Sequence, residues 1–223
     1  MYKFFRKLTA VVLVVCLISI SGMVPGSALS QRTQTVNIEI ETDSGYKSVS
    51  AMTKDKTVKN IVAATVVSTK PYVWTSKNGS RETYTVSKLK TTKVLLGTIK
   101  KDKTIYIWEY GATLSGNQYK QFDSSIIGWL MSSLNPNRSI DVVYSGYDFC
   151  RKGDKVVVYL IGNGEGTRLN TLSGHAKVYE LAGAVAGKLE KQSNGKYEWK
   201  DPDRGGKQFT MQQLVNIVKK YRK

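Results

Sequence analysis

Two residues in this chain have the chemistry of a nucleophile and its base: Cys150 and the single histidine, His175. A thiol beside an imidazole is the catalytic pair of cysteine hydrolases and peptidases. Cys150 follows the aromatic residues Tyr147 and Phe149, and cysteine in such surroundings usually behaves as a small buried hydrophobic residue. We therefore expect Cys150 to be buried and unreactive. A Cys/His-dependent hydrolase or peptidase remains the alternative function.

No motif in the sequence predicts a metal or a cofactor, and we expect none. One cysteine and one histidine cannot supply the four ligands of a structural zinc site. Residues 162–166 (Gly-Asn-Gly-Glu-Gly) follow a strand, as a dinucleotide-binding loop does, but Thr167 displaces the glycine pattern. Residues 168–174 do not favour the helix that such a loop requires. A calcium loop that begins at Asp201 would lack two ligands, since Gly205 and Gln212 occupy ligand positions, so we interpret both segments as loops.

A row of aromatic residues is the remaining candidate for ligand binding. Tyr106, Trp108 and Tyr110 fall on one face of a predicted strand, and Ile105 and Ile107 on the other. If the isoleucines face the core, the aromatic residues face outward, like the platforms on which OB-type barrels bind bases or sugars. We favour the other interpretation, in which the row packs beneath a helix, either that predicted over 124–134 or that at the C-terminus. The lysines just upstream that complete this candidate site are Lys101 and Lys103.

Short strands are the elements expected to position these residues. Apolar alternation or short apolar runs predict strands over 36–40, 61–67, 72–74, 82–86, 93–96, 104–110, 155–161, 178–181, 185–191 and 197–199. Asn78-Gly79 and Asn194-Gly195 predict hairpin turns, because both residue types tolerate a positive φ.

Two helices are predicted, over residues 124–134 and 211–221. The second begins with a capping box formed by Thr210 and Gln213. The pattern therefore predicts a mainly β fold: an antiparallel OB-like barrel or sandwich with a C-terminal α-helix and a short inserted helix.

The first thirty residues have the organisation of a Sec-type secretory signal peptide. A basic segment precedes the apolar run Leu8–Ile20, and the small residue at Ser30 favours cleavage between Ser30 and Gln31. The alternative is an uncleaved anchor, because Leu8–Val24 approaches the roughly 17 residues that can span a bilayer. In both cases we expect the rest of the chain outside the cytoplasm, secreted or associated with the cell envelope.

We divide the chain into a signal peptide (1–30), an N-terminal strand extension (31–57) and a single β-rich domain (58–223) that ends in a helix. The net charge is +17, and loss of the three basic residues of the presequence leaves +14. Such a charge predicts attraction to anionic surfaces. An anionic cell-wall polymer, a lipid headgroup and a partner protein are the partners considered, and no dedicated nucleic-acid motif is present. A basic surface that only keeps the protein soluble is the plainer interpretation.

The order of these segments also suggests a relationship. An apolar strand over 61–67 leads into a long hairpin, and Val94-Leu95-Leu96-Gly97 precedes the strand that begins at Lys103. Lys152–Leu160 and Asn194–Tyr197 follow. Over about residues 58–199 this order resembles a loose group of uncharacterised exported proteins of Gram-positive-type bacteria. The resemblance implies an OB-like β-barrel and no particular activity, so we expect an exported, non-enzymatic binding or interaction protein.

Overall fold

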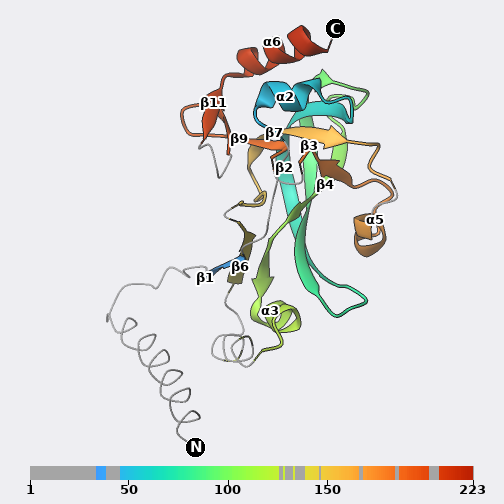
Figure 1. Ribbon diagram of the computed structural model, residues 1–223, viewed down its shortest axis with the longest axis vertical. Coiled ribbons are helices and arrows are strands. Elements are labelled where there is room, and N and C mark those ends of the chain that lie inside the picture. Colours follow the sequence, from blue (N-terminus) through green and yellow to red (C-terminus); the bar gives the residue numbers. More distant parts are fainter. Residues whose placement is uncertain are drawn as a thin grey trace, which may run out of the picture. The chain divides into compact units, whose positions relative to one another are not determined.

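The computed structural model divides the chain into two compact units, Met1–Arg32 and Thr33–Lys223. It describes residues 34–38, 46–125, 128, 133, 139–145, 147–165, 168–183, 186–200 and 206–222 (Figure 1). The proposed signal peptide and its cleavage site lie outside the described residues. Among the helices of the described part, none is both long enough and apolar enough to span a membrane.

The fold is mainly β, as predicted. The larger sheet has the strand order β11-β10-β9-β7-β2-β3-β4-β8. Strand β8 pairs in parallel with β4 and antiparallel with β7, so β7, β2, β3, β4 and β8 form a ring. Each pairing of β8 contains two residue pairs, and the ring is accordingly a partial, OB-like barrel. The strands of this sheet are β2 (Val58–Thr75), β3 (Arg81–Leu96), β4 (Thr104–Tyr110), β7 (Lys155–Ile161), β8 (Tyr179–Leu181), β9 (Lys188–Lys191), β10 (Tyr197–Trp199) and β11 (Lys207–Phe209).

Strands β2 and β3 form one long hairpin with 18 and 16 residues. The sequence predicts its turn at Asn78-Gly79, where Gly79 has a φ of 85°. It wrongly divides each strand in two, because irregular positions interrupt the alternation of polar and apolar residues. The register shifts three times along the pair, the last time between Val66 and Ser68. Such bulges increase the bend of a strand. The bent hairpin extends from the barrel to the smaller sheet (Figure 1).

A smaller sheet lies near the turn of this hairpin. Strand β6 (Ser139–Tyr144) pairs in parallel with β1 (Gln34–Ile38) and antiparallel with β5 (Ala112–Ser115). The helix α3 (Gly116–Phe122) follows β5 and begins with a capping box formed by Ser115 and Gln118. The sequence analysis did not predict β5, α3 or β6. The helix predicted over 124–134 lies mostly outside the described residues.

Two helices cover the outer face of the barrel at the opposite end (Figure 1). Helix α6 (Met211–Tyr221) has the predicted bounds and the predicted capping box between Thr210 and Gln213. Helix α2 (Val49–Lys54), inside the segment interpreted as a strand extension, packs its Val49 and Met52 into the same core. Their core also includes Ile61, Ala63, Val157, Tyr159, Leu189, Trp199, Leu214 and Val218.

The interior of the barrel is a separate apolar core. Ile105 and Ile107 point into it, as the alternation along β4 predicts. A further helix, α5 (Arg168–Ser173), lies outside the barrel beside β4 (Figure 1). The sequence analysis was wrong to exclude a helix there, because the buried side chain of Leu169 stabilises this short turn through tertiary packing.

Candidate functional site

The outer faces of β2, β3 and β4 form one continuous surface. Residues directly opposite each other in antiparallel strands point to the same face. The register therefore aligns three cross-strand rows: Ser68, Lys88 and Tyr106; Lys70, Val86 and Trp108; Tyr72, Tyr84 and Tyr110.

The middle of this surface is buried in an apolar cluster. Trp108 is only 8% exposed and packs edge-to-face against Tyr84, with ring centroids 5.5 Å apart. Leu169 of α5 joins the same apolar cluster. Trp108 therefore packs beneath a helix, as favoured, but that helix is α5, which the sequence analysis had not predicted. The Nε1 group of Trp108 has no hydrogen-bond partner among the described residues.

The end of the surface near the smaller sheet is aromatic and acidic. Tyr110 is half-buried, 5.2 Å from the ring of Tyr84 and 5.7 Å from that of Tyr144. Burial raises the pKa of Tyr110, and the charges of Glu82 and Glu180 raise it further. Burial also raises the pKa of Glu180. This end of the surface is thus poorly suited to an anion.

The other end is open and basic. Tyr106 stacks on His175, with ring centroids 3.7 Å apart and an interplanar angle of 18°. The ammonium group of Lys70 lies 5.2 Å from the ring centroid of Tyr72, a cation–π arrangement. These residues border a cavity of about 240 Å³, here called the Tyr106 groove, lined by Ser68, Thr69, Lys70, Tyr72, Val86, Lys88, Tyr106 and His175.

The lysines of the Tyr106 groove are not those that the sequence analysis selected. Lys101 and Lys103 are exposed on the turn between β3 and β4, outside the groove lining. Lys70 and Lys88 come from β2 and β3 and reach Tyr106 through strand pairing. Only the hairpin signal at Asn78-Gly79 could have placed them, by counting outward from the turn along both strands.

Cys150 and His175 are not brought together. Cys150 is fully buried, as predicted, in the barrel interior with Ile107, and its backbone N–H donates to Glu109 Oε2 at 3.0 Å. Burial, aided by the charge of Glu109, raises the pKa of the Cys150 thiol well above its ordinary value. His175 stacks on Tyr106, which is on the opposite face of β4 from Ile107. A protonated thiol without a neighbouring imidazole is a poor nucleophile.

A buried ion cluster near Cys150 is saturated with hydrogen bonds. Lys188 Nζ lies 2.8 Å from Glu109 Oε1 and 2.9 Å from Glu190 Oε1, and donates to the Asp148 carbonyl at 2.8 Å. These contacts use all three donors of an ammonium group. Burial disfavours the charge of Lys188, but the neighbouring acidic groups raise its pKa well above the ordinary value, and Lys188 in turn lowers the pKa of Glu190 despite burial. The cluster is therefore a structural element in which every charge has a partner.

Within the part of the chain that the structure describes, no three His, Cys, Asp or Glu side chains gather as a metal site would require. No protein-family model, curated protein or solved structure matches this chain. The chemistry of the Tyr106 groove is therefore the basis for assigning a function.

Proposed function

We propose that the protein is an exported, non-enzymatic binding protein that holds an anionic cell-envelope polymer in the Tyr106 groove. The observation that supports this proposal is the stacked pair of Tyr106 and His175, which lines an open cavity together with Lys70 and Lys88. Aromatic faces contact rings and apolar edges of a ligand, and lysines neutralise its negative groups.

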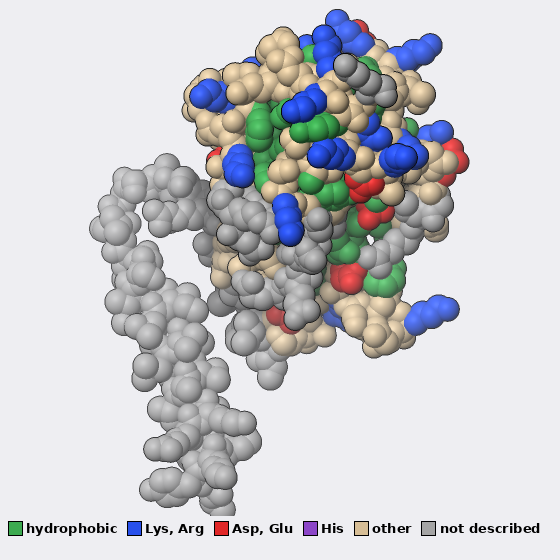
Figure 2. Space-filling view, turned by 45° about the horizontal axis from the view of Figure 1, so that its top comes forward, with side chains coloured by type: hydrophobic (Ala, Val, Ile, Leu, Met, Phe, Trp, Pro, Cys, Tyr) green, Lys and Arg blue, Asp and Glu red, His purple; other side chains and the backbone are tan. Residues whose placement is uncertain are grey.

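A polymer suits the groove better than a small enclosed ligand. The cavity follows neighbouring strands along the surface of the sheet and is not sealed in the barrel. The net charge of +14 that remains after loss of the presequence increases the encounter rate with a polyanion. Lys and Arg side chains are spread over the face shown in Figure 2 and do not gather in one patch, so general attraction alone selects no site. The groove supplies the local contacts that such attraction lacks.

The hydrolase alternative has less support. Its nucleophile is buried inside the barrel, and its base is stacked on the outside. Lipid headgroups and partner proteins are the other partners considered. The experiment below distinguishes lipid headgroups from the polymer.

The test compares two variants that remove the same charge. Lys70→Gln/Lys88→Gln changes the groove, and Lys101→Gln/Lys103→Gln changes the exposed turn. Binding to glycerol-phosphate teichoic acid is measured by calorimetry over a range of salt concentrations. Each lost phosphate contact should lower the salt dependence of log K by up to about one unit. We expect the groove variant to bind at least about tenfold more weakly, because it removes both lysines of the groove. A tenfold loss corresponds to about 1.4 kcal/mol.

Equal weakening in the two variants would mean that attraction is general and that the groove is not the site. Anionic vesicles of phosphatidylglycerol form the second arm of the experiment. Tighter binding to vesicles than to the polymer, with the groove variant unaffected, would assign the protein to lipid headgroups instead. Thermal unfolding of each variant shows that it is folded before binding is measured.

A further inference from the structure

A second cavity lies at the end of the barrel where β2 begins and β7 ends. It has a volume of about 410 Å³, within the range of about 300–1,000 Å³ that is usual for small-molecule sites. Its lining comes from four separate segments of the chain. Lys59 and Asn60 belong to β2, Thr98 to the turn after β3, Gly162 and Asn163 to the loop after β7, and Lys177 and Tyr179 to the start of β8 and the residues before it.

Asn60 is the buried polar group of this cavity. Its side chain is held by the turn after β3, because Oδ1 accepts hydrogen bonds from Thr98 N at 2.9 Å and Ile99 N at 3.2 Å. Gly97, with a φ of +99°, permits this approach, since a Cβ there would lie 2.2 Å from Asn60 Oδ1. These bonds fix the orientation of the amide, so that Nδ2 must be a donor.

The donor of Asn60 is left for a ligand. Asn60 is 5% exposed, and Nδ2 makes no hydrogen bond to any residue in the described part of the chain. In the described part of the chain, the fully buried side-chain atoms without a partner are Ser87 Oγ and Trp108 Nε1, so Asn60 Nδ2 keeps access to solvent and is free to donate. The residue lines the cavity, so a ligand there can accept this bond.

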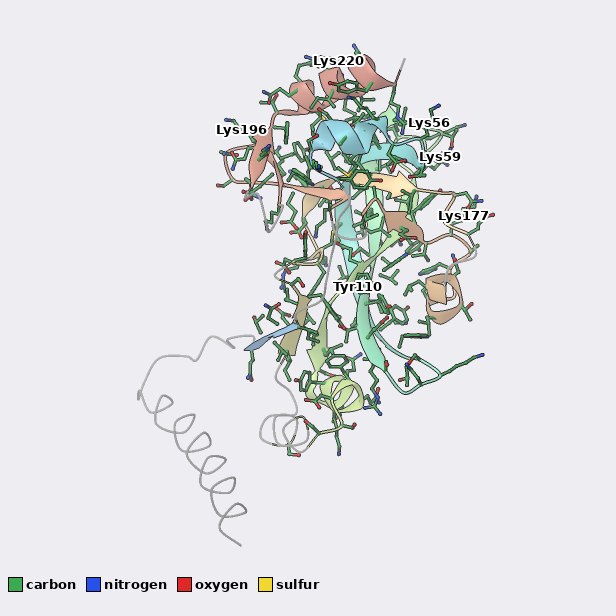
Figure 3. The ribbon with its side chains drawn as sticks, in the orientation of Figure 1. Lys56, Lys59, Tyr110, Lys177, Lys196 and Lys220 are labelled. Carbon is green, nitrogen blue, oxygen red and sulfur yellow. The ribbon has the colours of Figure 1, made fainter. Side chains whose placement is uncertain are left out.

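Two lysines provide positive charge at the same cavity. Figure 3 shows Lys59 and Lys177 on the same side of the molecule, away from Lys196 and Lys220. Lys177 Nζ lies 2.9 Å from Glu165 Oε1, and both side chains are about half exposed. The side chain of Asn163 also donates to Glu165, at 3.1 Å. An ion pair this exposed contributes little to stability and exchanges readily for a stronger anionic partner.

We infer that this cavity binds a phosphate group, with Asn60 Nδ2 donating a hydrogen bond and Lys59 and Lys177 neutralising its charge. Lys177 exchanges Glu165 for the phosphate when the anion binds. A tetrahedral dianion accepts hydrogen bonds in several directions, which matches donors that arrive from β2 and from the segment before β8. The site is distinct from the Tyr106 groove and shares no residue with it.

The experiment measures binding of inorganic phosphate, and in a second arm of glycerol 3-phosphate, by calorimetry and by amide chemical shifts. Asn60→Asp keeps an oxygen for the N–H groups of Thr98 and Ile99 but replaces the donor by a carboxylate. We expect it to bind phosphate at least about tenfold more weakly, because like charges repel at short range. Lys59→Gln should weaken binding by about three- to tenfold.

Glu165→Gln should change the phosphate affinity in the opposite direction. It removes the competitor for Lys177, and we expect phosphate to bind about two- to fivefold more tightly. Lys196→Gln is the matched control, since it removes one exposed lysine from the turn between β9 and β10. It should change phosphate affinity by less than about twofold.

The inference fails if the unmodified protein shows no saturable phosphate binding, or if Lys196→Gln weakens it as much as Lys59→Gln. Should Asn60→Asp not fold, the opposite effects of Lys59→Gln and Glu165→Gln decide the question. Tighter binding of glycerol 3-phosphate than of inorganic phosphate identifies a phosphate ester as the ligand, and the reverse identifies the free ion. The Lys70→Gln/Lys88→Gln variant should retain full phosphate binding, which separates this site from the proposed function.

Discussion

The two faces of strand β4 differ in the burial and pairing of their polar and charged groups. The inner face carries Ile105, Ile107 and Glu109, and the single charge among them is buried against Lys188 at 2.8 Å. The outer face carries Tyr106, Trp108 and Tyr110, and its burial decreases from Trp108 toward the groove at Tyr106. A closed interior requires a partner for each charge, whereas a half-covered aromatic face has polar groups available for a ligand.

The difference separates stability from binding along one strand. Residues of the inner face should affect unfolding alone, and so should Trp108 on the outer face. Tyr106 should affect binding more than unfolding. Four measurements test this division, and they are given from the largest expected effect to the smallest.

Removing Lys188 should have the largest effect. Lys188→Met leaves Glu109 buried without its cation, and a broken buried ion pair costs about 3–5 kcal/mol. Lys200→Met is the control, since Lys200 pairs with Glu190 at 3.1 Å but is half exposed. Urea unfolding should show a small loss for Lys200→Met and recovery of stability in the Lys188→Met/Glu109→Leu double variant. Similar losses in the two single variants would contradict the assignment of Lys188 to the core.

Trp108→Ala should destabilise the outer face by about 3 kcal/mol, because truncating a buried aromatic residue leaves a cavity. Trp108→Phe should cost much less, since Nε1 has no partner among the described residues to lose. Thermal unfolding measures both. A Trp108→Ala protein that keeps its melting temperature but loses polymer binding would show that Trp108 is a contact residue after all.

Lowering the pH should change the contributions of Glu190 and Glu180 to the free energy of unfolding in opposite directions. The pKa of Glu190 is lowered, so its contribution to stability is present above the ordinary value of 4.5 and is lost as the pH falls through the folded-state pKa. The pKa of Glu180 is raised by burial, so its contribution is present below 4.5 and is lost as the pH rises through the folded-state pKa.

Unfolding free energies measured across this pH range should therefore differ between two variants. Glu190→Gln should reduce the loss of stability in acid. Glu180→Gln should stabilise the protein at neutral pH by less than about 1 kcal/mol, because Glu180 is only half buried and solvent screens it. If both substitutions changed the unfolding free energy at neutral pH in the same direction, the expected contrast between Glu190 and Glu180 would be wrong.

Tyr106→Leu should have only a small effect on stability. Its stacking with His175 is worth about 0.5–1.5 kcal/mol beyond the buried area, and leucine retains part of that area. Polymer binding that survives at high salt should be lost in this variant, because stacking does not depend on salt as ion pairing does. A variant that binds normally at high salt would exclude Tyr106 as a contact.

Local patterns were sufficient to predict much of this fold. Alternation along β4 placed Ile105 and Ile107 inside, and the capping box at Thr210 gave the correct start of α6. The capping box at Ser115 and Gln118 was equally visible and would have predicted α3. Residues 168–173 carried no local helix signal, because α5 depends on burying Leu169 beneath it.

The sites were harder to predict, since their residues meet through long-range pairing. Lys188 forms an ion pair with Glu109, and Lys177 and Lys59 line one cavity, only once the chain has folded. Charge and composition report that lysines are abundant, but not which of them have a carboxylate within reach. The groove lysines Lys70 and Lys88 required the register of β2 with β3.

The length of the β2–β3 hairpin bears on the order in which the chain folds. Its strands are joined by one short turn, so pairing them closes only a small loop. Pairing β2 with β7, or α2 with α6, must instead join segments far apart in the chain, and such contacts slow folding. We therefore expect the hairpin and β4 to be structured in the transition state, with α6 docking late. Mutations in the hairpin should then slow folding, and mutations in α6 should mainly accelerate unfolding.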